Sequence, residues 1–208
     1  LKDMVSAPGV DKKPGHQIAL MPGSRKGELK TLLPILLESA QLISERVPDA
    51  QFVVLKAPTL RKEAYDKYLN KYKFKIKLLE KNHYEAIRES RLAICCSGTA
   101  TLECAILGTP MIVTNKVSLV SYVTIKTIIK VNSVGLPNFI LGKNIFPEFL
   151  QSKATSENIS SEAIKILSDE KKLKTLEKSC EEASRLIGGT GASIRAADEI
   201  LALLSPSK

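Results

Sequence analysis

The sequence contains no tryptophan, and aromatic residues of all kinds make up only 5% of its 208 positions. So few aromatic side chains provide no platform on which nucleic-acid bases could stack, and the 31 lysines and arginines are scattered along the chain. We therefore expect no nucleic acid among the partners. The net charge of +9 still favours an anionic partner, which leaves phosphorylated ligands and anionic membrane surfaces.

Long apolar runs are also lacking. No run approaches the roughly 20 residues needed to cross a bilayer, and no signal-peptide pattern opens the chain. The two histidines, His16 and His83, belong to no Ser/His/Asp or Cys/His pattern of a nucleophilic enzyme. The cysteines have no metal-ligand spacing, so we expect free thiols in a reducing cytoplasm. They are Cys95, Cys96, Cys104 and Cys180.

Short apolar runs alternate with amphipathic stretches in the pattern of a parallel sheet covered by helices. Helices are predicted over residues 27–47, 60–72 and 83–90, and three more in the tail after Ser156. This order predicts an α/β fold, a Rossmann-like, doubly wound parallel sheet flanked by helices, with a helical carboxy-terminal tail. The predicted strands are residues 17–21, 51–55, 76–79, 92–96 and 111–114.

The chain divides into three parts. Residues 1–16 are rich in Pro, Gly and Lys and are interpreted as a linker, so we expect the chain to be the end of a longer protein. Residues 17–155 are expected to form the Rossmann-like domain. Residues 156–208 are expected to form helices that pack on this domain or on a missing one.

A glycine turn follows the first predicted strand and opens a helix, with the sequence PGSRKGE at residues 22–28. Gly23 would let the backbone approach an anion, the helix N-terminus supplies partial positive charge, and Arg25 can form a bidentate contact with a phosphate. The turn is therefore a candidate diphosphate cradle. The alternative is an ordinary strand-to-helix turn in which Ser24 caps the helix and Arg25 is solvated.

Small residues also follow the fourth predicted strand, with the sequence SGTATLE at residues 97–103. Their small side chains permit a close approach of the backbone to a ligand, and Thr99 and Thr101 add hydroxyl groups. Glu103 lies about one turn into the helix, where its carboxylate could accept hydrogen bonds from a ribose diol. The alternative is a capping arrangement in which Glu103 interacts with the helix dipole.

A third stretch, LPNFILGKNIFPEFLQ at residues 136–151, mixes turn residues and polar side chains with apolar neighbours. A loop this apolar should pack down, so its polar side chains need partners, which a sugar or nucleotide could supply. Chemistry alone favours the alternative, a structural loop in which Asn138 and Gln151 satisfy the backbone.

Together these motifs carry a family resemblance. GSRxxE, SGTATLE and LPNFILGKNIFPEFLQ occur in the order and approximate spacing of lipid-A-disaccharide synthases, which the chain resembles from about Gln17 to its end. The resemblance implies one half of a glycosyltransferase with two Rossmann-like domains, the GT-B fold. It also implies transfer of 2,3-diacylglucosamine from UDP-diacylglucosamine to diacylglucosamine 1-phosphate. The products are the β-1,6-linked disaccharide 1-phosphate and UDP, and no metal or other cofactor is expected.

The resemblance further implies that the two glycine turns hold the donor's diphosphate and ribose. Arg25 would stabilise the diphosphate, and Glu103 would hold the ribose. The catalytic base belongs to the family's amino-terminal, acceptor-binding domain, so we expect this chain alone to bind the donor without turnover. The full set of implied donor contacts is Gly23, Ser24, Arg25, Ser97, Gly98, Thr99, Glu103, Asn138, Glu148 and Gln151.

Residues 116–130 combine apolar side chains with lysines and a tyrosine, and family members have a basic, aromatic-bearing helical stretch here. The stretch would meet acyl chains or anionic lipid at the cytoplasmic face of the bacterial inner membrane. A buried helix with solvated lysines is the alternative. Asn115 departs from the family, which often has Tyr at this position. The candidate membrane contacts are Lys116, Tyr122, Lys126 and Lys130.

Two other functions stay open. One is a UDP-sugar-binding subunit of a split glycosyltransferase, and the other is a basic module that binds membrane surfaces without catalysis. The apolar faces of the carboxy-terminal helices, around residues 173–204, need a surface to bury. This predicts contact with the missing amino-terminal domain or formation of a homodimer.

Overall fold

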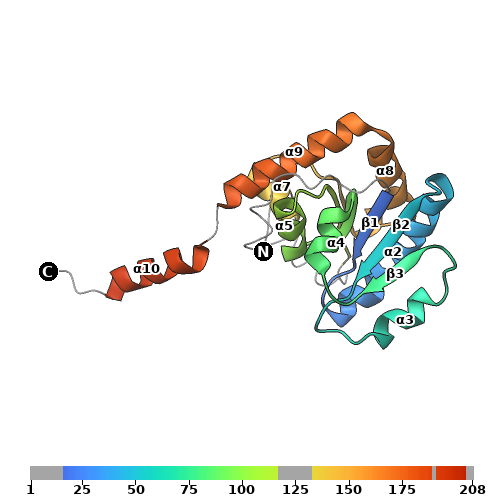
Figure 1. Ribbon diagram of the computed structural model, residues 1–208, viewed down its shortest axis with the longest axis horizontal. Coiled ribbons are helices and arrows are strands. Elements are labelled where there is room, and N and C mark those ends of the chain that lie inside the picture. The colour runs from blue at the N-terminus through green and yellow to red at the C-terminus, as the bar shows by residue number, and fades with distance from the viewer. Residues whose placement is uncertain (1–15, 117–132, 189–190, 205–208) are drawn as a thin grey trace.

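The computed structural model describes residues 16–116, 133–188 and 191–204. At its centre lies a six-stranded parallel sheet in the order β3-β2-β1-β4-β5-β6 (Figure 1). All five predicted strands are present, and the predicted Rossmann-like α/β class with its helical tail is confirmed. The strands are β1 (His16–Met21), β2 (Ala50–Leu55), β3 (Ile76–Leu79), β4 (Leu92–Cys96), β5 (Met111–Asn115) and β6 (Glu148–Leu150).

Burial follows each strand's place in the sheet. All five residues of β4 are buried, as expected for a central parallel strand that is covered on both faces. β3 lies at an edge, and each of its four residues keeps some exposure to solvent. A continuous apolar run in the sequence therefore marks a central strand, whereas a run interrupted by Lys77 marks an edge.

Helices connect the strands and continue beyond the sheet. The longest, α2, buries apolar side chains at helical spacing and is capped at its end by Val47, just before Pro48. The helix predicted over residues 60–72 is shorter in the structure, because Asn70 already caps its end. The helices are α2 (Lys26–Arg46), α3 (Glu63–Leu69), α4 (His83–Glu89), α5 (Thr99–Ile106), α7 (Leu136–Leu141), α8 (Ser156–Ser168), α9 (Glu170–Ile187), α10 (Ala192–Leu204) and the short 3₁₀ helix η1 (Gln151–Lys153).

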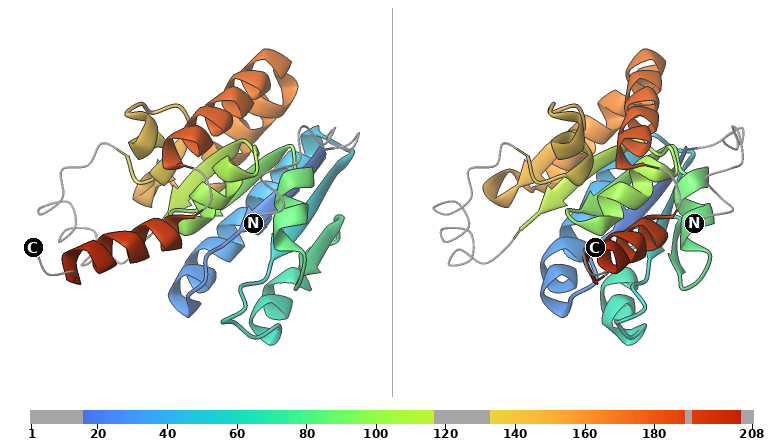
Figure 2. Two further views of the ribbon diagram at one scale, coloured as in Figure 1. Left: turned by 60° about the vertical axis from the view of Figure 1, so that its left-hand side comes forward. Right: turned by 90° about the vertical axis from the view of Figure 1, so that its left-hand side faces the viewer.

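The helices form two layers around the sheet. α2 packs against α3 and α8, whereas α5 packs against α4, α7 and α9 (Figure 1, Figure 2). The path of the chain explains this division. Strands β1 to β3 and strands β4 to β6 proceed in opposite directions from the middle of the sheet, and right-handed crossovers then place their helices on opposite faces.

The strand order reverses between β1 and β4, which are neighbours in the sheet although they are far apart in sequence. In open parallel sheets, ligands bind outside the carboxyl ends of the strands at such a reversal. The turns that follow β1 and β4 are the two glycine turns. The topology therefore brings two motifs together that the sequence shows only as separate segments.

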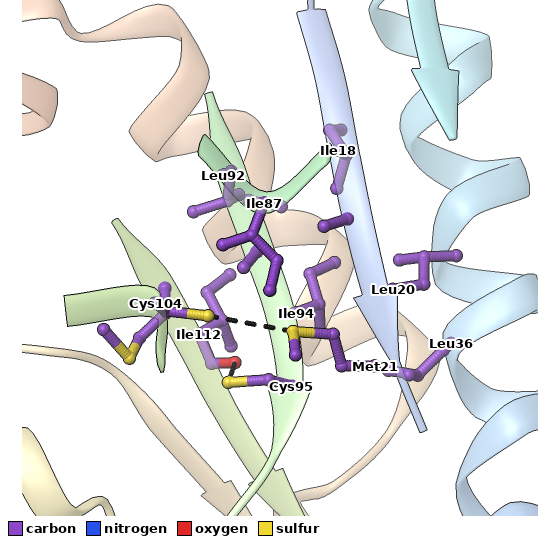
Figure 3. Close-up of a cluster of buried hydrophobic side chains, with 14 of the residues drawn as sticks. Ile18, Leu20, Met21, Leu36, Ile87, Leu92, Ile94, Cys95, Cys104 and Ile112 are labelled. Carbon is purple, nitrogen blue, oxygen red and sulfur yellow. Dashed lines mark hydrogen bonds between the residues drawn. The ribbon is translucent and has the colours of Figure 1, made fainter. Parts of the chain in front are cut away.

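Sulfur atoms fill part of the core beneath this reversal (Figure 3). The Cys104 thiol of α5 contacts the Met21 sulfur of β1 at 3.7 Å, and the Cys95 thiol of β4 donates to the Ile112 carbonyl of β5, also at 3.7 Å. All four cysteines are free and buried. Because polarizable sulfur fills irregular gaps well, the contact between Cys104 and Met21 packs α5 onto the sheet.

The last helix stands apart from the rest of the domain. α8 and α9 pack against helices of the sheet domain, whereas α10 extends away from it (Figure 1, Figure 2). Its apolar side chains are exposed, with Leu203 at 85% and Leu204 at 74%. No helix among the described residues is long and apolar enough to cross a membrane. Within the described part of the chain, α10 thus leaves an apolar face exposed.

Candidate functional site

A cavity of about 790 Å³ lies at the carboxyl ends of β1, β2, β3 and β4. Both glycine turns contribute to its lining, because β1 and β4 are adjacent in the sheet. The structure therefore brings together most of the residues that were expected to contact a donor. Those that line the cavity are Gly23, Ser24, Arg25, Ser97, Gly98, Thr99 and Glu103.

The first turn is closed by a side chain of its own helix. The Glu28 carboxylate accepts hydrogen bonds from the backbone N–H groups of Ser24 at 2.9 Å and Arg25 at 3.2 Å. It also pairs with the Arg25 guanidinium at 2.9 Å. Arg25 is therefore the N-cap residue, and the alternative expectation that Ser24 caps the helix is wrong, because Glu28 supplies the capping acceptor.

Gly23 has a φ of +102°, a conformation that favours glycine, and the space beside it is already taken. A Cβ atom at this position would lie 2.4 Å from a carboxylate oxygen of Glu28. On the other side of the turn, the Thr59 hydroxyl donates to the Ser24 carbonyl at 2.7 Å. In the structure, Gly23 thus makes room for the Glu28 side chain.

The second turn has the opposite character. Gly98 has a φ of +130°, and a Cβ atom built there would meet nothing within 4 Å. No side chain caps α5 and its first turn carries no acidic residue, so the alternative in which Glu103 belongs to a capping arrangement is wrong. The Thr101 hydroxyl instead donates to the Gly98 carbonyl at 2.7 Å. The N–H groups at the start of α5 therefore begin at the cavity wall without a side-chain cap.

Asn115, at the end of β5, supports the second turn, a role that the sequence motifs did not reveal. Its side-chain nitrogen donates to the Ser97 hydroxyl oxygen at 2.6 Å. Ser97 then accepts from Asn115 and keeps its own proton for another acceptor. Because β5 pairs with β4, the last residue of β5 reaches the turn that follows β4. The only signal in the sequence was its position at the carboxyl end of a predicted strand.

Glu103 lines the cavity from the second turn of α5. Burial raises the pKa of its carboxyl group, and the nearby His83 opposes that shift. His83 is itself held by a hydrogen bond between its Nε2 and the Leu79 carbonyl at 3.0 Å. With Lys81 and Tyr84, it forms a wall of the cavity that follows β3 and that no motif had marked.

Cys96 ends β4 and lines the same cavity. Burial, reinforced by the nearby Glu28, raises the pKa of its thiol to about 12. The thiol therefore stays protonated at neutral pH and cannot act as a nucleophile. Among the described residues, no group of three or more His, Cys, Asp or Glu side chains could hold a metal ion. The cavity offers N–H, hydroxyl, guanidinium and carboxylate groups, which can bind an anionic, hydroxyl-bearing ligand.

The third motif forms a separate network around Asn138, which is buried in α7. The side-chain nitrogen of Asn138 donates to the Phe146 carbonyl and to the Glu148 carboxylate, both at 2.8 Å. Its side-chain oxygen accepts from the backbone N–H groups of Ile145 at 3.0 Å and Phe146 at 2.9 Å. In the structure, Asn138 thus satisfies the backbone of its own segment.

Glu148 begins the edge strand β6 and belongs to the same network. Its carboxylate accepts from the backbone N–H groups of Val134 at 2.9 Å and Gly135 at 3.0 Å, and from the Ser133 hydroxyl. Gln151 follows in η1 with a φ of +52°. The lining of the cavity contains neither these two residues nor Asn138, so their assignment to the donor stays a prediction.

The candidate membrane segment is largely beyond the described residues. Lys116 is described and is exposed, directly after β5. Tyr122, Lys126 and Lys130 lie outside the described residues. The contact of this segment with lipid therefore stays a prediction.

The fold is that of one Rossmann-like half of the GT-B architecture. CalG4, the calicheamicin glycosyltransferase, shares this fold with a TM-score of 0.61 and 14% identity, over 95% of this chain and 45% of that chain. The spinosyn rhamnosyltransferase SpnG, complexed with thymidine diphosphate, aligns with a TM-score of 0.59 and 14% identity, over 90% of this chain and 46% of that chain. At such identities the likeness shows the fold alone.

Sequence similarity identifies the protein family, which the fold alone does not. The family model for lipid-A-disaccharide synthetase matches residues 5–202. The lipid-A-disaccharide synthase of Anaeromyxobacter dehalogenans (strain 2CP-C) is 37% identical over 188 residues, which are 90% of this chain and 49% of that protein. The enzyme of Syntrophus aciditrophicus (strain SB) is 37% identical over 191 residues, 91% of this chain and 50% of that protein. The chain belongs to the lipid-A-disaccharide synthase family and spans about half the length of these relatives.

Proposed function

We propose that this chain is the donor-binding half of a lipid-A-disaccharide synthase. The cavity at the strand-order reversal is the observation that supports this most, because it combines the turn at Arg25, the turn at Gly98 and the carboxylate of Glu103. These groups match the chemistry of a nucleoside diphosphate. Its phosphates need N–H groups and a cation, and its ribose diol needs a carboxylate acceptor.

The proposed reaction transfers 2,3-diacylglucosamine from UDP to 2,3-diacylglucosamine 1-phosphate. The bond from the donor sugar's anomeric carbon to the diphosphate breaks, and the acceptor's 6-hydroxyl oxygen forms the new bond as its proton passes to the catalytic base. UDP leaves with the electron pair of the broken bond and so gains negative charge. The uncapped N-terminus of α5 and the Arg25 guanidinium would stabilise that charge. The hydroxyl groups of Ser97 and Thr99 would donate further hydrogen bonds to the phosphates.

The remaining donor contacts divide between two regions. Glu103 would accept from the ribose hydroxyls on one side of the cavity. The segment with Asn138, Glu148 and Gln151 would border the donor's nucleotide or sugar mainly through its shape, because the polar atoms of Asn138 and Glu148 are already bonded within the segment.

Catalysis would require more than this chain. The relatives are about twice as long as the region they share with it, since the match covers 49% of the first. We propose that the chain corresponds to the carboxy-terminal half of the family, and that the acceptor site and the catalytic base belong to the amino-terminal half. On this proposal the chain binds UDP-diacylglucosamine but does not transfer its sugar on its own.

Two surfaces would face other partners. The net charge of +9 and the segment that begins at Lys116 would hold the protein to the anionic, cytoplasmic face of the bacterial inner membrane. The exposed apolar face of α10 would pack on the amino-terminal domain or on a second copy of the chain. Sedimentation at several protein concentrations, with Leu203→Asp as the comparison, would distinguish a monomer from a homodimer.

The proposed function is tested by calorimetric titration of the chain with UDP, followed by Arg25→Ala and Glu103→Ala. Each substitution removes one predicted contact and should weaken UDP binding at least about tenfold, as expected for a charge-assisted hydrogen bond. Arg46→Ala and Glu45→Ala change the same residue types at the far, exposed end of α2 and should leave binding unchanged. The proposal would be contradicted if the folded chain had no saturable affinity for UDP either unaltered or with Glu28 replaced by Ala.

A further inference from the structure

The Glu28 carboxylate occupies the donors that the sequence suggests for a diphosphate. It accepts from the N–H groups of Ser24 and Arg25 at 2.9 and 3.2 Å and from the Arg25 guanidinium at 2.9 Å. Two neighbouring backbone N–H groups and a guanidinium form a well-developed anion site at a helix N-terminus. In this structure the anion in that site belongs to the protein itself.

The turn is shaped to accept this carboxylate. Gly23 lies so close to Glu28 that a Cβ atom would come within 2.4 Å of the carboxylate and 2.8 Å of the Glu28 Cβ. Thr59 fixes the other side of the turn through the Ser24 carbonyl. The side chain of Glu28 is only 23% exposed, whereas that of Arg25 is 84% exposed. The closed turn is therefore well packed around Glu28, whereas the Arg25 side chain is mostly exposed to solvent.

A phosphate and Glu28 cannot use the turn at the same time. Each backbone N–H group has one proton to donate, and both protons already point to Glu28. Two anions at contact distance would also repel each other, more strongly in a partly buried site than in water. Both Glu28 and the turn line the cavity, so a diphosphate that entered it would meet this carboxylate directly.

We propose that Glu28 is an internal competitor for the diphosphate of the nucleotide. It holds the turn at Ser24 and Arg25 until the phosphates displace it, and it takes the same donors back when UDP leaves. This inference rests on the proposed function and adds a determinant of affinity and product release to that site. The apparent affinity for UDP is then reduced in proportion to how firmly Glu28 closes the turn.

If Glu28 is a competitor, its removal must change UDP affinity in one particular direction. Removal of a group that only braces Arg25 or the turn would weaken UDP binding. Removal of a competitor strengthens UDP binding and leaves binding of the uncharged nucleoside unchanged. A capping interaction of about 1 kcal/mol corresponds to about a fivefold change in affinity, which sets the size of the expected gain.

The experiment compares UDP and uridine as ligands of the intact chain, in calorimetric titrations at constant ionic strength. The variants are Glu28→Ala, which removes the acceptor, and Glu28→Gln, which keeps its length but not its charge. Glu45→Gln removes the same charge from the exposed end of the same helix and serves as the matched control. Thermal unfolding of each variant shows that it is folded.

We expect Glu28→Ala to bind UDP about fivefold more tightly than the unaltered chain, with Glu28→Gln between the two. Uridine affinity should be equal in all of them, and Glu45→Gln should behave like the unaltered chain. Equal or weaker UDP binding by both folded Glu28 variants would overturn the competitor. If neither the unaltered chain nor Glu28→Ala binds UDP, the proposed function fails as well. UDP binding by Glu28→Ala alone would support the competitor in its strongest form.

Discussion

The two glycine turns of the cavity are similar in sequence but differ in what their backbone N–H groups contact. Before α2, the third helical residue is Glu28, which folds back and accepts from the turn. Before α5, the corresponding residue is Thr101, whose hydroxyl donates to the Gly98 carbonyl and leaves the N–H groups uncapped. A helix N-terminus is thus available to an outside anion only where its own first turn supplies no acceptor.

Because of this difference, the two turns would bind a diphosphate in different ways. The turn at Gly98 can meet a diphosphate without rearrangement, because the space beside Gly98 is open. The turn at Ser24 can do so only after Glu28 has moved. Arg25 is the exception within the first turn, since its mostly exposed side chain can reach a ligand from outside.

The largest effect is expected from Gly98→Ala. The φ of +130° and ψ of −155° at this position suit only glycine, and the new methyl group would project toward the open space at the turn. We expect UDP affinity to fall by more than about tenfold and the free energy of unfolding by about 1–3 kcal/mol. Calorimetry and thermal unfolding measure the two quantities.

Gly27→Ala is the matched control for that substitution. Gly27 lies inside α2, and a Cβ atom there would meet nothing within 4 Å. Its replacement should leave UDP binding unchanged and stabilise the helix by up to about 1 kcal/mol. Normal UDP affinity in Gly98→Ala would show that the α5 turn does not hold the phosphates.

Glu103→Gln tests the ribose side of the same helix. Loss of the carboxylate should weaken UDP binding about tenfold, because a charged acceptor is replaced by a neutral one. The unaltered chain should also bind UDP more tightly than 2′-deoxy-UDP, and the variant should lose most of that preference. A preference of equal size in both proteins would place the ribose elsewhere.

The pH dependence of UDP binding gives a further test of Glu103. Burial raises the pKa of its carboxyl, so protonation occurs at a higher pH than for an ordinary glutamate. Only the carboxylate is a full acceptor for the diol. We therefore expect UDP affinity to decrease as the pH falls through this raised pKa, and Glu103→Gln should remove that part of the dependence in titrations between neutral and acidic pH.

Asn115→Ala should have a moderate effect on the α5 turn. The substitution removes the 2.6 Å hydrogen bond that orients the Ser97 hydroxyl. UDP affinity should fall about threefold, in line with roughly 0.5–1 kcal/mol for one hydrogen bond. In a Ser97→Ala background the same substitution should add almost nothing. Asn144→Ala, on an exposed segment outside the cavity lining, is the control.

The smallest predicted effect is a difference in the free energy of unfolding between variants of the two turns. Glu28→Ala removes a cap and should lower the free energy of unfolding by about 1 kcal/mol. Thr99→Ala removes no cap from α5, so the change should stay within about 0.5 kcal/mol. Denaturant titration of both variants measures the difference. Equal destabilisation would mean that the α5 turn is also closed by one of its own side chains.

Most of the strands and helices could be predicted from local sequence, but the elements within residues 136–151 were not predicted. The first five strands were visible as short apolar runs, but β6 was not, since it is three residues long and only partly buried. α7 was missed although Pro137 lies in its first turn and Gly142 caps its end, which are recognisable helix signals. Both elements lie within the stretch that was interpreted as a loop, where turn residues obscured the short helix.

The candidate site was predictable to the extent that it depends on single turns. The positions of Gly23, Gly98 and Glu103 relative to their helices follow from local spacing, and all three line the cavity. The closure of the first turn by Glu28 could have been inferred from an acid at the third helical position, but an arginine N-cap obscured that pattern. The support of Ser97 by Asn115 could not be inferred, because it crosses between strands.

By itself, the sequence determined the first five strands, the helices between them and the two glycine turns, since apolar periodicity and turn chemistry act over a few neighbouring residues. Only the tertiary structure decided that β1 and β4 are adjacent, which unites the turns in one cavity. It also decided that Asn138 and Glu148 are satisfied within their own segment. The physical reason is that strand order and side-chain partners depend on contacts between distant segments, which local preferences do not specify.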